Sequence, residues 1–264
     1  MIIAQISDLH ICDEGALYKG VVSTNDMARA AVAHLNALDP APDLVLLTGD
    51  VVEDGTASQY AAATAILAGV RAPLFVMPGN HDDRDALRAA FPEHRYMPPA
   101  GPINYAVDDL AVRIIALDVT VPGAHHGEVA ADTLAWLEGV LDAGGDKPTI
   151  VAMHQPPFVC GIPYLDRYRC MEPEGLGEIL ARYPTIERVI CGHVHRSIQR
   201  RWSGTLVTTC PSTATQIALA LRPDAPSASY LEPPGCLLHQ WSEATGLVTH
   251  LSYIGSFAGP FPFA

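Results

Sequence analysis

The sequence predicts an α/β fold, because short apolar strands alternate with amphipathic helical segments along most of its 264 residues. A second observation is that polar residues able to carry chemistry follow several of these strands directly. A third is the composition, in which 49% of residues are hydrophobic and 17% are charged, as in ordinary globular proteins. The length allows one large domain, or one domain with an appendage, around a substantial core.

The first half of the chain contains most of the expected elements. Residues 2–6 form a buried strand, residues 24–38 a helix with Thr24 or Asn25 as N-cap, and residues 44–47 a second strand. An Ala-rich helix at residues 58–67 and a strand at residues 74–77 follow. Residues 83–91 are helical, and residues 103–107 and 112–117 form a β-pair.

A helix at residues 131–141 ends at Gly144 and Gly145. Strands at residues 149–153 and 188–190 flank a helix at residues 175–182. The pattern then changes, because strand-like segments at residues 206–209, 236–241 and 247–253 surround a Pro-rich loop at residues 222–234. This last part is expected to form further sheet, an oligomerisation arm, or both.

The acidic charge limits the partners of the protein. A net charge of −13 disfavours nucleic acid and anionic membranes, although a local cationic site could still bind an anion. No apolar run approaches the ~20 residues that a transmembrane helix needs, and the first residues do not resemble a signal peptide. The six scattered cysteines contain no C-x-x-C pair and are expected to be free thiols, which favours the cytoplasm.

The first candidate ligands are Asp8 and His10, which follow the strand at residues 2–6. Residues i and i+2 of an extended backbone point to the same side, so this carboxylate and imidazole are expected to face one point. Asp50 follows the next strand directly after Gly49, and a glycine there lets the backbone come close to a ligand. A carboxylate can bridge two cations, although an Asp after a strand is also a common cap or turn residue.

The most specific motif is Gly79-Asn80-His81-Asp82, which follows the strand at residues 74–77. The amide oxygen of Asn80 suits a hard or borderline metal beside carboxylates. His81 lies one residue farther along and is placed to meet a substrate oxygen instead of a metal.

Three further histidines, His154, His193 and His195, follow two more strands, and the H-x-H spacing again directs two imidazoles to one side. The carboxyl ends of strands form the edge at which open α/β sheets bind ligands. We therefore predict one metal centre at this edge. Its seven expected ligands are Asp8, His10, Asp50, Asn80, His154, His193 and His195.

These motifs, in this order and at similar spacing, resemble those of the calcineurin-like metallophosphoesterase superfamily over about residues 1–200. The run Ile6-Ser7-Asp8-Leu9-His10 and residues 76–83 most resemble the bacterial class III cyclic-nucleotide phosphodiesterases and glycerophosphodiesterases. The resemblance implies a four-layer αββα sandwich of the metallo-dependent phosphatase type. Residues 1–200 would be the catalytic core. Residues 201–264, within the same domain, would add strands that complete the second sheet and a Pro-rich arm for a homodimer or higher homo-oligomer.

The resemblance also implies how two divalent metals are held. One would bind Asp8, His10 and His195, the other Asn80, His154 and His193, and Asp50 would bridge both. A ligand set without thiolate fits Mn, Fe, Co or Zn. Hydroxide held by the metal pair would attack phosphorus in line. The expected catalytic residues are Asp50, which sets the separation of the metals, and His81, which contacts the phosphate or protonates the leaving alkoxide.

The expected substrate is a small phosphodiester, such as 3′,5′-cyclic AMP or a glycerophosphodiester. The nearest alternative is a phosphomonoesterase of the same superfamily. A nuclease is less favoured because the chain offers little material for a cationic track, and a non-catalytic scaffold with the same fold is a third alternative. Loops at residues 12–19, 53–58 and 158–170 are candidates for the pocket walls, with Tyr18, Tyr164 and Tyr168 either contacting substrate or packing in the loops. His125-His126 could approach the site from its loop but is expected at the surface, and Arg200-Arg201 could contact an anionic substrate but is expected to be a solvated pair.

Overall fold

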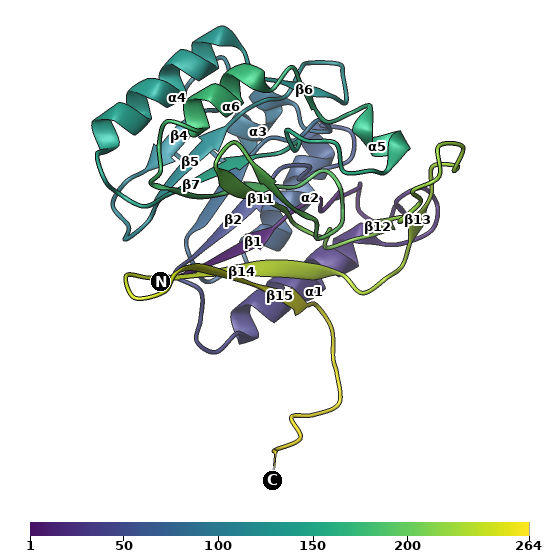
Figure 1. Cartoon of the computed structure of the whole chain (residues 1–264). Helices are drawn as coiled ribbons and strands as arrows, with labels where there is room; N and C mark the ends of the chain where they lie inside the picture. Colours follow the sequence, from purple (N-terminus) through teal and green to yellow (C-terminus); the bar gives the residue numbers. More distant parts are fainter. Residues whose placement is uncertain (264) are drawn as a thin grey trace.

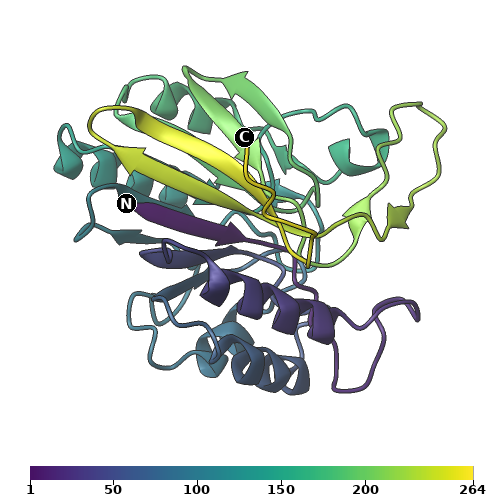
Figure 2. The same ribbon diagram turned by 90° about the horizontal axis from the view of Figure 1, so that it is seen from below.

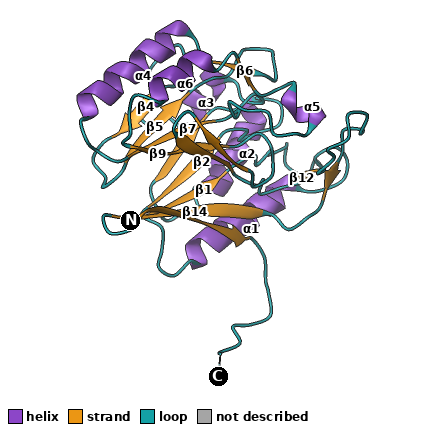
Figure 3. Ribbon diagram, in the orientation of Figure 1, coloured by secondary structure: helices purple, strands orange, loops and turns teal. Residues whose placement is uncertain are grey.

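The computed structural model describes residues 1–263. Two large β-sheets lie face to face and helices cover the outer face of each, which confirms the four-layer αββα architecture (Figures 1 and 3). Helices α1, α2 and α3 pack with the first sheet, and α4 and α6 pack with the second. The six helices are α1 Thr24–Ala37, α2 Ala57–Leu67, α3 Arg84–Ala90, α4 Ala131–Gly144, α5 Pro163–Asp166 and α6 Glu174–Leu180.

The first sheet has the strand order β15-β14-β1-β2-β3. Strands β1, β2 and the edge strand β3 are parallel to one another, and β14 pairs with β1 in antiparallel orientation. All residues of β2 are buried, which is the pattern of a central strand covered on both faces. The bounds are β1 Ile2–Ile6, β2 Leu44–Thr48, β3 Leu74–Met77, β14 Gly235–Ser242 and β15 Gly246–Tyr253.

The second sheet has the order β10-β11-β9-β7-β5-β4. Strands β5, β7, β9 and β11 are parallel, and β4 and β10 are antiparallel edge strands. The bounds are β4 Tyr105–Val107, β5 Arg113–Leu117, β7 Thr149–Met153, β9 Ile186–Cys191, β10 Gln199–Trp202 and β11 Thr205–Thr209. Two short ribbons pair β6 Gly127–Glu128 with β8 Cys170–Met171, and β12 Gln216–Ile217 with β13 Ser229–Tyr230.

The sequence predicted that the C-terminal strands complete the second sheet, but only some of them do so. Strand β11 joins that sheet, but β14 and β15 extend the first sheet, where they run beside β1 (Figure 2). Strand β2 occupies only one edge of β1, and β14 pairs with the other edge in antiparallel orientation. A local hydrophobic pattern carries no information about which sheet edge a strand will occupy.

The N-cap of α1 also differs from the prediction. Ser23 is the cap and accepts from the Asp26 backbone N–H at 3.2 Å. Thr24 instead donates to the His10 carbonyl at 2.6 Å, and Asn25 makes two hydrogen bonds to the backbone of Cys12. These two side chains therefore hold the loop that follows β1, and a tertiary contact has replaced a local one.

All six cysteines are free, as expected from their spacing. Among residues 1–263, none of the helices has both the length and the apolar character needed to span a bilayer.

Candidate metal centre and active site

The structure brings all seven predicted ligands together at the carboxyl ends of β1, β2, β3, β7 and β9, in the space between the two sheets. Backbone hydrogen bonds tie the loops that carry them. Asp8 N–H donates to the Gly49 carbonyl, and His10 N–H donates to the Asp50 carbonyl, both at 3.1 Å. Gly192 N–H donates to the His154 carbonyl at 3.0 Å.

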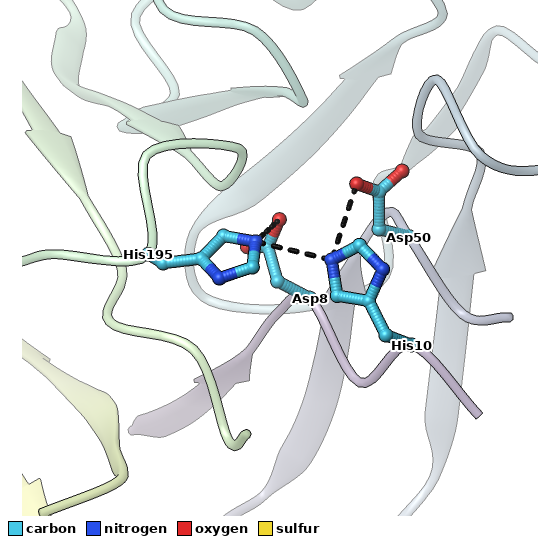
Figure 4. A group of neighbouring side chains, drawn as sticks. All are labelled: Asp8, His10, Asp50 and His195. Carbon is cyan, nitrogen blue, oxygen red and sulfur yellow. Dashed lines mark hydrogen bonds and ion pairs between the residues drawn. The ribbon is translucent and has the colours of Figure 1, made fainter. Parts of the chain in front are cut away.

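One cluster contains Asp8, His10, Asp50 and His195, all of them buried (Figure 4). His195 Nε2 lies 3.3 Å from Asp8 Oδ1 and 3.0 Å from His10 Nε2. His10 Nε2 lies 3.6 Å from Asp50 Oδ2. Two carboxylates and two imidazoles thus converge on one point from three separate loops.

A second cluster contains Asp50, His154 and His193, and shares Asp50 with the first. His154 Nε2 lies 3.3 Å from Asp50 Oδ2. His193 Nδ1 lies 2.9 Å from Asn80 Oδ1, so the Asn80 amide joins this second cluster. Because Asp50 Oδ2 faces both His10 and His154, the arrangement has the form of two adjacent ligand sets with one common member.

The imidazoles are held with their free nitrogens toward the clusters. The Nδ1–H groups of His154 and His195 donate to the Thr48 and Thr215 carbonyls, at 2.7 and 2.8 Å. His10 Nδ1 donates to Glu53 Oε2 at 2.7 Å. When the rings are neutral, each Nε2 presents a lone pair, and the lone pairs of His10 and His195 then face each other. A cation between the two Nε2 atoms would remove this repulsion, because both lone pairs could then coordinate it. Two imidazoles in this orientation are therefore suited to bind a metal.

Buried nitrogens without partners support the same conclusion. The Nε2 atoms of His154 and His193 are buried and make no hydrogen bond within the described residues. A buried polar atom without a partner is costly, and such atoms are rare. Oxygen and nitrogen donors of this kind, without thiolate, fit divalent cations.

Five of the seven candidate ligands have left-handed backbone conformations that non-glycine residues rarely adopt: Asp8, His10, Asp50, His193 and His195 have φ values of 55°, 46°, 50°, 68° and 52°. Asp8 and His10 therefore do not converge through the alternation of an extended strand, as the sequence suggested. They converge because the backbone turns sharply after β1. Strain of this kind persists where the surrounding structure enforces it, and it concentrates at functional sites.

Two glycines allow these loops to meet. Gly49 has φ 90°, and a Cβ atom there would lie 2.8 Å from Gly79 Cα. A Cβ atom on Gly79 would contact Asp50 Oδ1 and lie 2.8 Å from His154 Cε1. Both glycines are therefore needed for the close approach of the β2 and β3 loops, as the sequence predicted for Gly49.

The electrostatics of the centre favour positive charge. Burial alone would raise the pKa of Asp50, but the neighbouring His154 and His81 outweigh burial and hold the pKa well below its usual value. Burial alone would lower the pKa of His154, but Asp50 and Asp8 raise it to about 9. The carboxylates thus stabilise a cation at this place, and the same field would attract a divalent metal.

His81 lies beside the clusters without joining either of them. Its backbone N–H donates to Asp50 Oδ1 at 2.9 Å, and its Nδ1 donates to the Glu53 carbonyl at 2.7 Å. Burial would lower the pKa of His81, but Asp50 and Glu53 raise it, so the ring tends to hold its proton. With Nδ1 occupied, Nε2 is the nitrogen left for a ligand in the cavity that His81 lines.

A cavity of about 290 Å³ opens over the centre. Two of the three loops proposed for its walls contribute, through Tyr18 and Lys19 and through Tyr164, Leu165 and Tyr168. The third loop, at residues 53–58, lines a neighbouring groove through Asp54 and Gly55. Sequence reasoning missed the wall formed by Thr215, Ile217, Ser227, Ala228 and Ser229, because no local pattern places the Pro-rich loop over the site.

Three residues outside the predicted set also lie at the site: His125, Gln155 and Glu53. His125 is exposed, as predicted, but it lines the cavity, and its Nδ1 accepts from Asn80 Nδ2 at 3.1 Å. Gln155 donates to the His125 carbonyl at 3.1 Å and so fixes the loop beside His154. Glu53 bonds His10 and His81, as described above. The signal for Glu53 was its position three residues after Asp50, in a loop already considered for the pocket.

The comparisons with known proteins agree with this geometry. A sequence model of the calcineurin-like phosphoesterase family matches residues 1–197. A protein from Arcobacter nitrofigilis named probable glycerophosphodiester phosphodiesterase GpdQ is 36% identical over 264 residues, which cover 100% of this chain and 97% of the relative. The 3′,5′-cyclic adenosine monophosphate phosphodiesterase CpdA of Pseudomonas aeruginosa is 29% identical over 219 residues, 83% of this chain and 78% of that protein.

Among solved structures, a dimetal phosphatase from Danio rerio matches with a TM-score of 0.64 and 15% identity, and the match covers 97% of this chain and 99% of that one. At this level of identity the likeness supports the fold alone.

Proposed function

Because the chain belongs to the calcineurin-like phosphoesterase family, we propose that it is a metal-dependent phosphodiesterase that hydrolyses small phosphodiesters. The observation that carries the proposal is the pair of buried ligand clusters that share Asp50, beside a cavity lined by His81. The proposed ligands are Asp8, His10, Asp50 and His195 at the first metal position, and Asp50, Asn80, His154 and His193 at the second.

When bound, two divalent cations of the Mn, Fe, Co or Zn type supply an activated water and positive charge beside phosphorus. The protein orients the ligands for this task. Glu53 and the Thr48 carbonyl hold the Nδ1–H groups of His10 and His154, which keeps both Nε2 atoms toward the centre. Protonated His81 donates from Nε2 to the leaving alcohol oxygen, while its Nδ1–H stays on the Glu53 carbonyl.

We propose a glycerophosphodiester as the first substrate to test, since the similarity to the protein named glycerophosphodiester phosphodiesterase extends over the whole chain. The second candidate is 3′,5′-cyclic AMP, which is supported by the similarity to the cyclic-nucleotide phosphodiesterase over 83% of the chain. A phosphomonoesterase remains the alternative reaction, because the ligand clusters alone do not select between mono- and diesters.

The proposal predicts that chelated protein is inactive and regains activity with Mn²⁺ or another of these metals. Reloaded protein is expected to hydrolyse bis(p-nitrophenyl) phosphate faster than p-nitrophenyl phosphate, and a glycerophosphodiester faster than cyclic AMP. Metal content and initial rates are the measurements. A metal-free protein with full activity contradicts the metal mechanism, and a faster monoester contradicts the diesterase assignment.

A prediction concerns His125, whose ring accepts from the Asn80 amide nitrogen and so turns the amide oxygen toward His193. His125→Ala removes this acceptor and is expected to weaken the second metal position by about tenfold, as losses around metal ligands often do. Titration with Mn²⁺ measures the change. The matched control is His126→Ala, since His126 is adjacent but pairs with Glu128 at 3.1 Å instead. Equal affinities in the two variants would count against the role of His125.

We also propose a homodimer or higher homo-oligomer. The support is the apolar C-terminal tail, which leaves the body of the protein after β15 and carries exposed phenylalanines, Phe257, Phe261 and Phe263 (Figure 1). A monomer by light scattering would remove this proposal. The division into a core at residues 1–200 and an additional part at residues 201–264 of the same domain, and the cytoplasm as the compartment, stay predictions.

A further inference from the structure

A continuous series of hydrogen bonds, part-buried at its start and fully buried from His239 onward, joins the two sheets beneath the candidate metal centre. It begins at Arg188 on β9, whose guanidinium donates to Thr249 Oγ1 on β15. Thr249 donates in turn to His239 Nδ1 on β14 at 2.8 Å. His239 Nε2–H then donates to Gln5 Oε1 on β1 at 3.0 Å. The series therefore crosses from the second sheet into the first.

The series returns to the second sheet through Gln5. The Gln5 amide nitrogen donates to Thr48 Oγ1 on β2 at 2.9 Å and to the Cys191 carbonyl at the end of β9 at 3.0 Å. We call Arg188, Thr249, His239, Gln5 and Thr48 the inter-sheet bridge. The bridge starts on β9 at Arg188 and, through Gln5, reaches both Thr48 on β2 and the Cys191 carbonyl at the end of β9, so it fastens β9 to β15, β14, β1 and β2.

Each bond of the bridge has a fixed direction. Gln5, Thr48 and His239 have no exposed surface, so this part of the bridge lies in the core, whereas Arg188 and Thr249 are half-buried. Burial, and then the charge of Arg188, lower the pKa of His239 to about 3, so the ring is neutral. A neutral imidazole offers one donor and one acceptor, and Gln5 and Thr249 use one each. The three fully buried members, Gln5, Thr48 and His239, have all their polar side-chain atoms hydrogen-bonded, and a satisfied buried group of this kind defines one arrangement of its strands.

The bridge ends at two residues that hold the second ligand cluster. The Thr48 carbonyl accepts from His154 Nδ1 at 2.7 Å. Cys191 is followed by Gly192 and His193, whose backbone begins the turn into the site. By contrast, the Nδ1–H groups of the first cluster are bound by Glu53 and by the Thr215 carbonyl, which lie outside the bridge.

We infer that Gln5 and His239 are positioning residues that set the places of His154 and His193, so that the inter-sheet bridge governs the second metal position selectively. This inference rests on the proposed metal centre. The bridge fixes Thr48 and Cys191 relative to each other across the two sheets. A shift between Thr48 and Cys191 separates His154 from His193. His154 is hydrogen-bonded to the Thr48 carbonyl, and His193 comes two residues after Cys191 in the chain. The first position keeps the contacts that orient its two imidazoles, Glu53 for His10 and the Thr215 carbonyl for His195.

The test is a Mn²⁺ titration of the full chain, followed by calorimetry and by the spin-coupled electron paramagnetic resonance signal that only a metal pair gives. Gln5→Leu preserves volume and removes the hydrogen bonds. We expect the dissociation constant of the second metal to rise about tenfold, while that of the first stays within about threefold. His239→Leu is expected to act in the same direction, and His239→Gln, which keeps a donor, to restore binding. Gln240→Leu, the same change at an exposed position of β14, is the matched control.

The outcomes separate the two proposals. If wild-type protein fails to bind a metal pair, the proposed centre is wrong. If wild-type protein binds a pair but Gln5→Leu and His239→Leu weaken both metals equally or neither metal, the bridge has no selective role and the inference is wrong. If the leucine variants do not fold, Thr249→Val decides, since it removes one hydroxyl from the bridge at nearly constant shape. A selective loss of about threefold at the second position supports the inference, and unchanged binding overturns it.

Discussion

Asp50→Ala is expected to lose both metals and almost all activity. Asp50 is the one residue common to the two buried ligand clusters, and its Oδ2 atom lies 3.6 Å from His10 Nε2 and 3.3 Å from His154 Nε2. A catalytic metal contributes several kcal/mol of transition-state stabilisation, and each 1.4 kcal/mol is about a factor of ten. The value of kcat/KM should therefore fall by about 10³ or more, together with metal content.

The control for Asp50→Ala is Asp109→Ala, which removes an exposed carboxylate in the turn between β4 and β5. It is expected to leave metal content and kcat/KM unchanged. Metal analysis and steady-state rates on the same samples test the pair. An Asp50→Ala protein that retains two metals, or retains activity after losing them, would refute the shared-ligand role.

His81→Ala is expected to lower kcat by about 10²–10⁴ and to leave metal content intact, because loss of a general acid has effects of this size. The structure separates the two properties. His81 lines the cavity and bonds the Glu53 carbonyl through Nδ1, but it belongs to neither of the clusters that contain Asp50. Metal analysis, kcat and KM of the variant are the measurements.

The leaving group sharpens the test of His81. A p-nitrophenolate departs without a proton, whereas the alcohol of a glycerophosphodiester needs one. His81→Ala should therefore lose much less activity with bis(p-nitrophenyl) phosphate than with the glycerophosphodiester. His250→Ala, at an exposed position of β15, is the control. Equal losses on both substrates would mean that His81 binds the phosphate and does not act as the acid.

Local sequence patterns determined most of the individual elements. Strands β1, β3 and β7 have the predicted bounds, because each is a short apolar run limited by polar or turn residues. The cap of α1 was wrong by one residue, because Thr24 and Asn25 bond the loop after β1. The partners of these two side chains, His10 and Cys12, lie 13 or 14 residues earlier in the sequence, so a local pattern does not reveal the contacts.

Residue types and spacing were sufficient to indicate the kind of chemistry, a metal centre at one sheet edge built from Asp8, His10, Asp50, Asn80, His154, His193 and His195. Contacts between remote segments supplied what no local pattern contains. They brought Thr215 and Ser229 into the cavity wall, tied the Asn80 amide to His125, and joined Gln5 to His239 across 234 residues. The physical reason is that ligand chemistry is a property of side chains, while distances, tautomers and strand edges depend on contacts between segments that are remote in the chain.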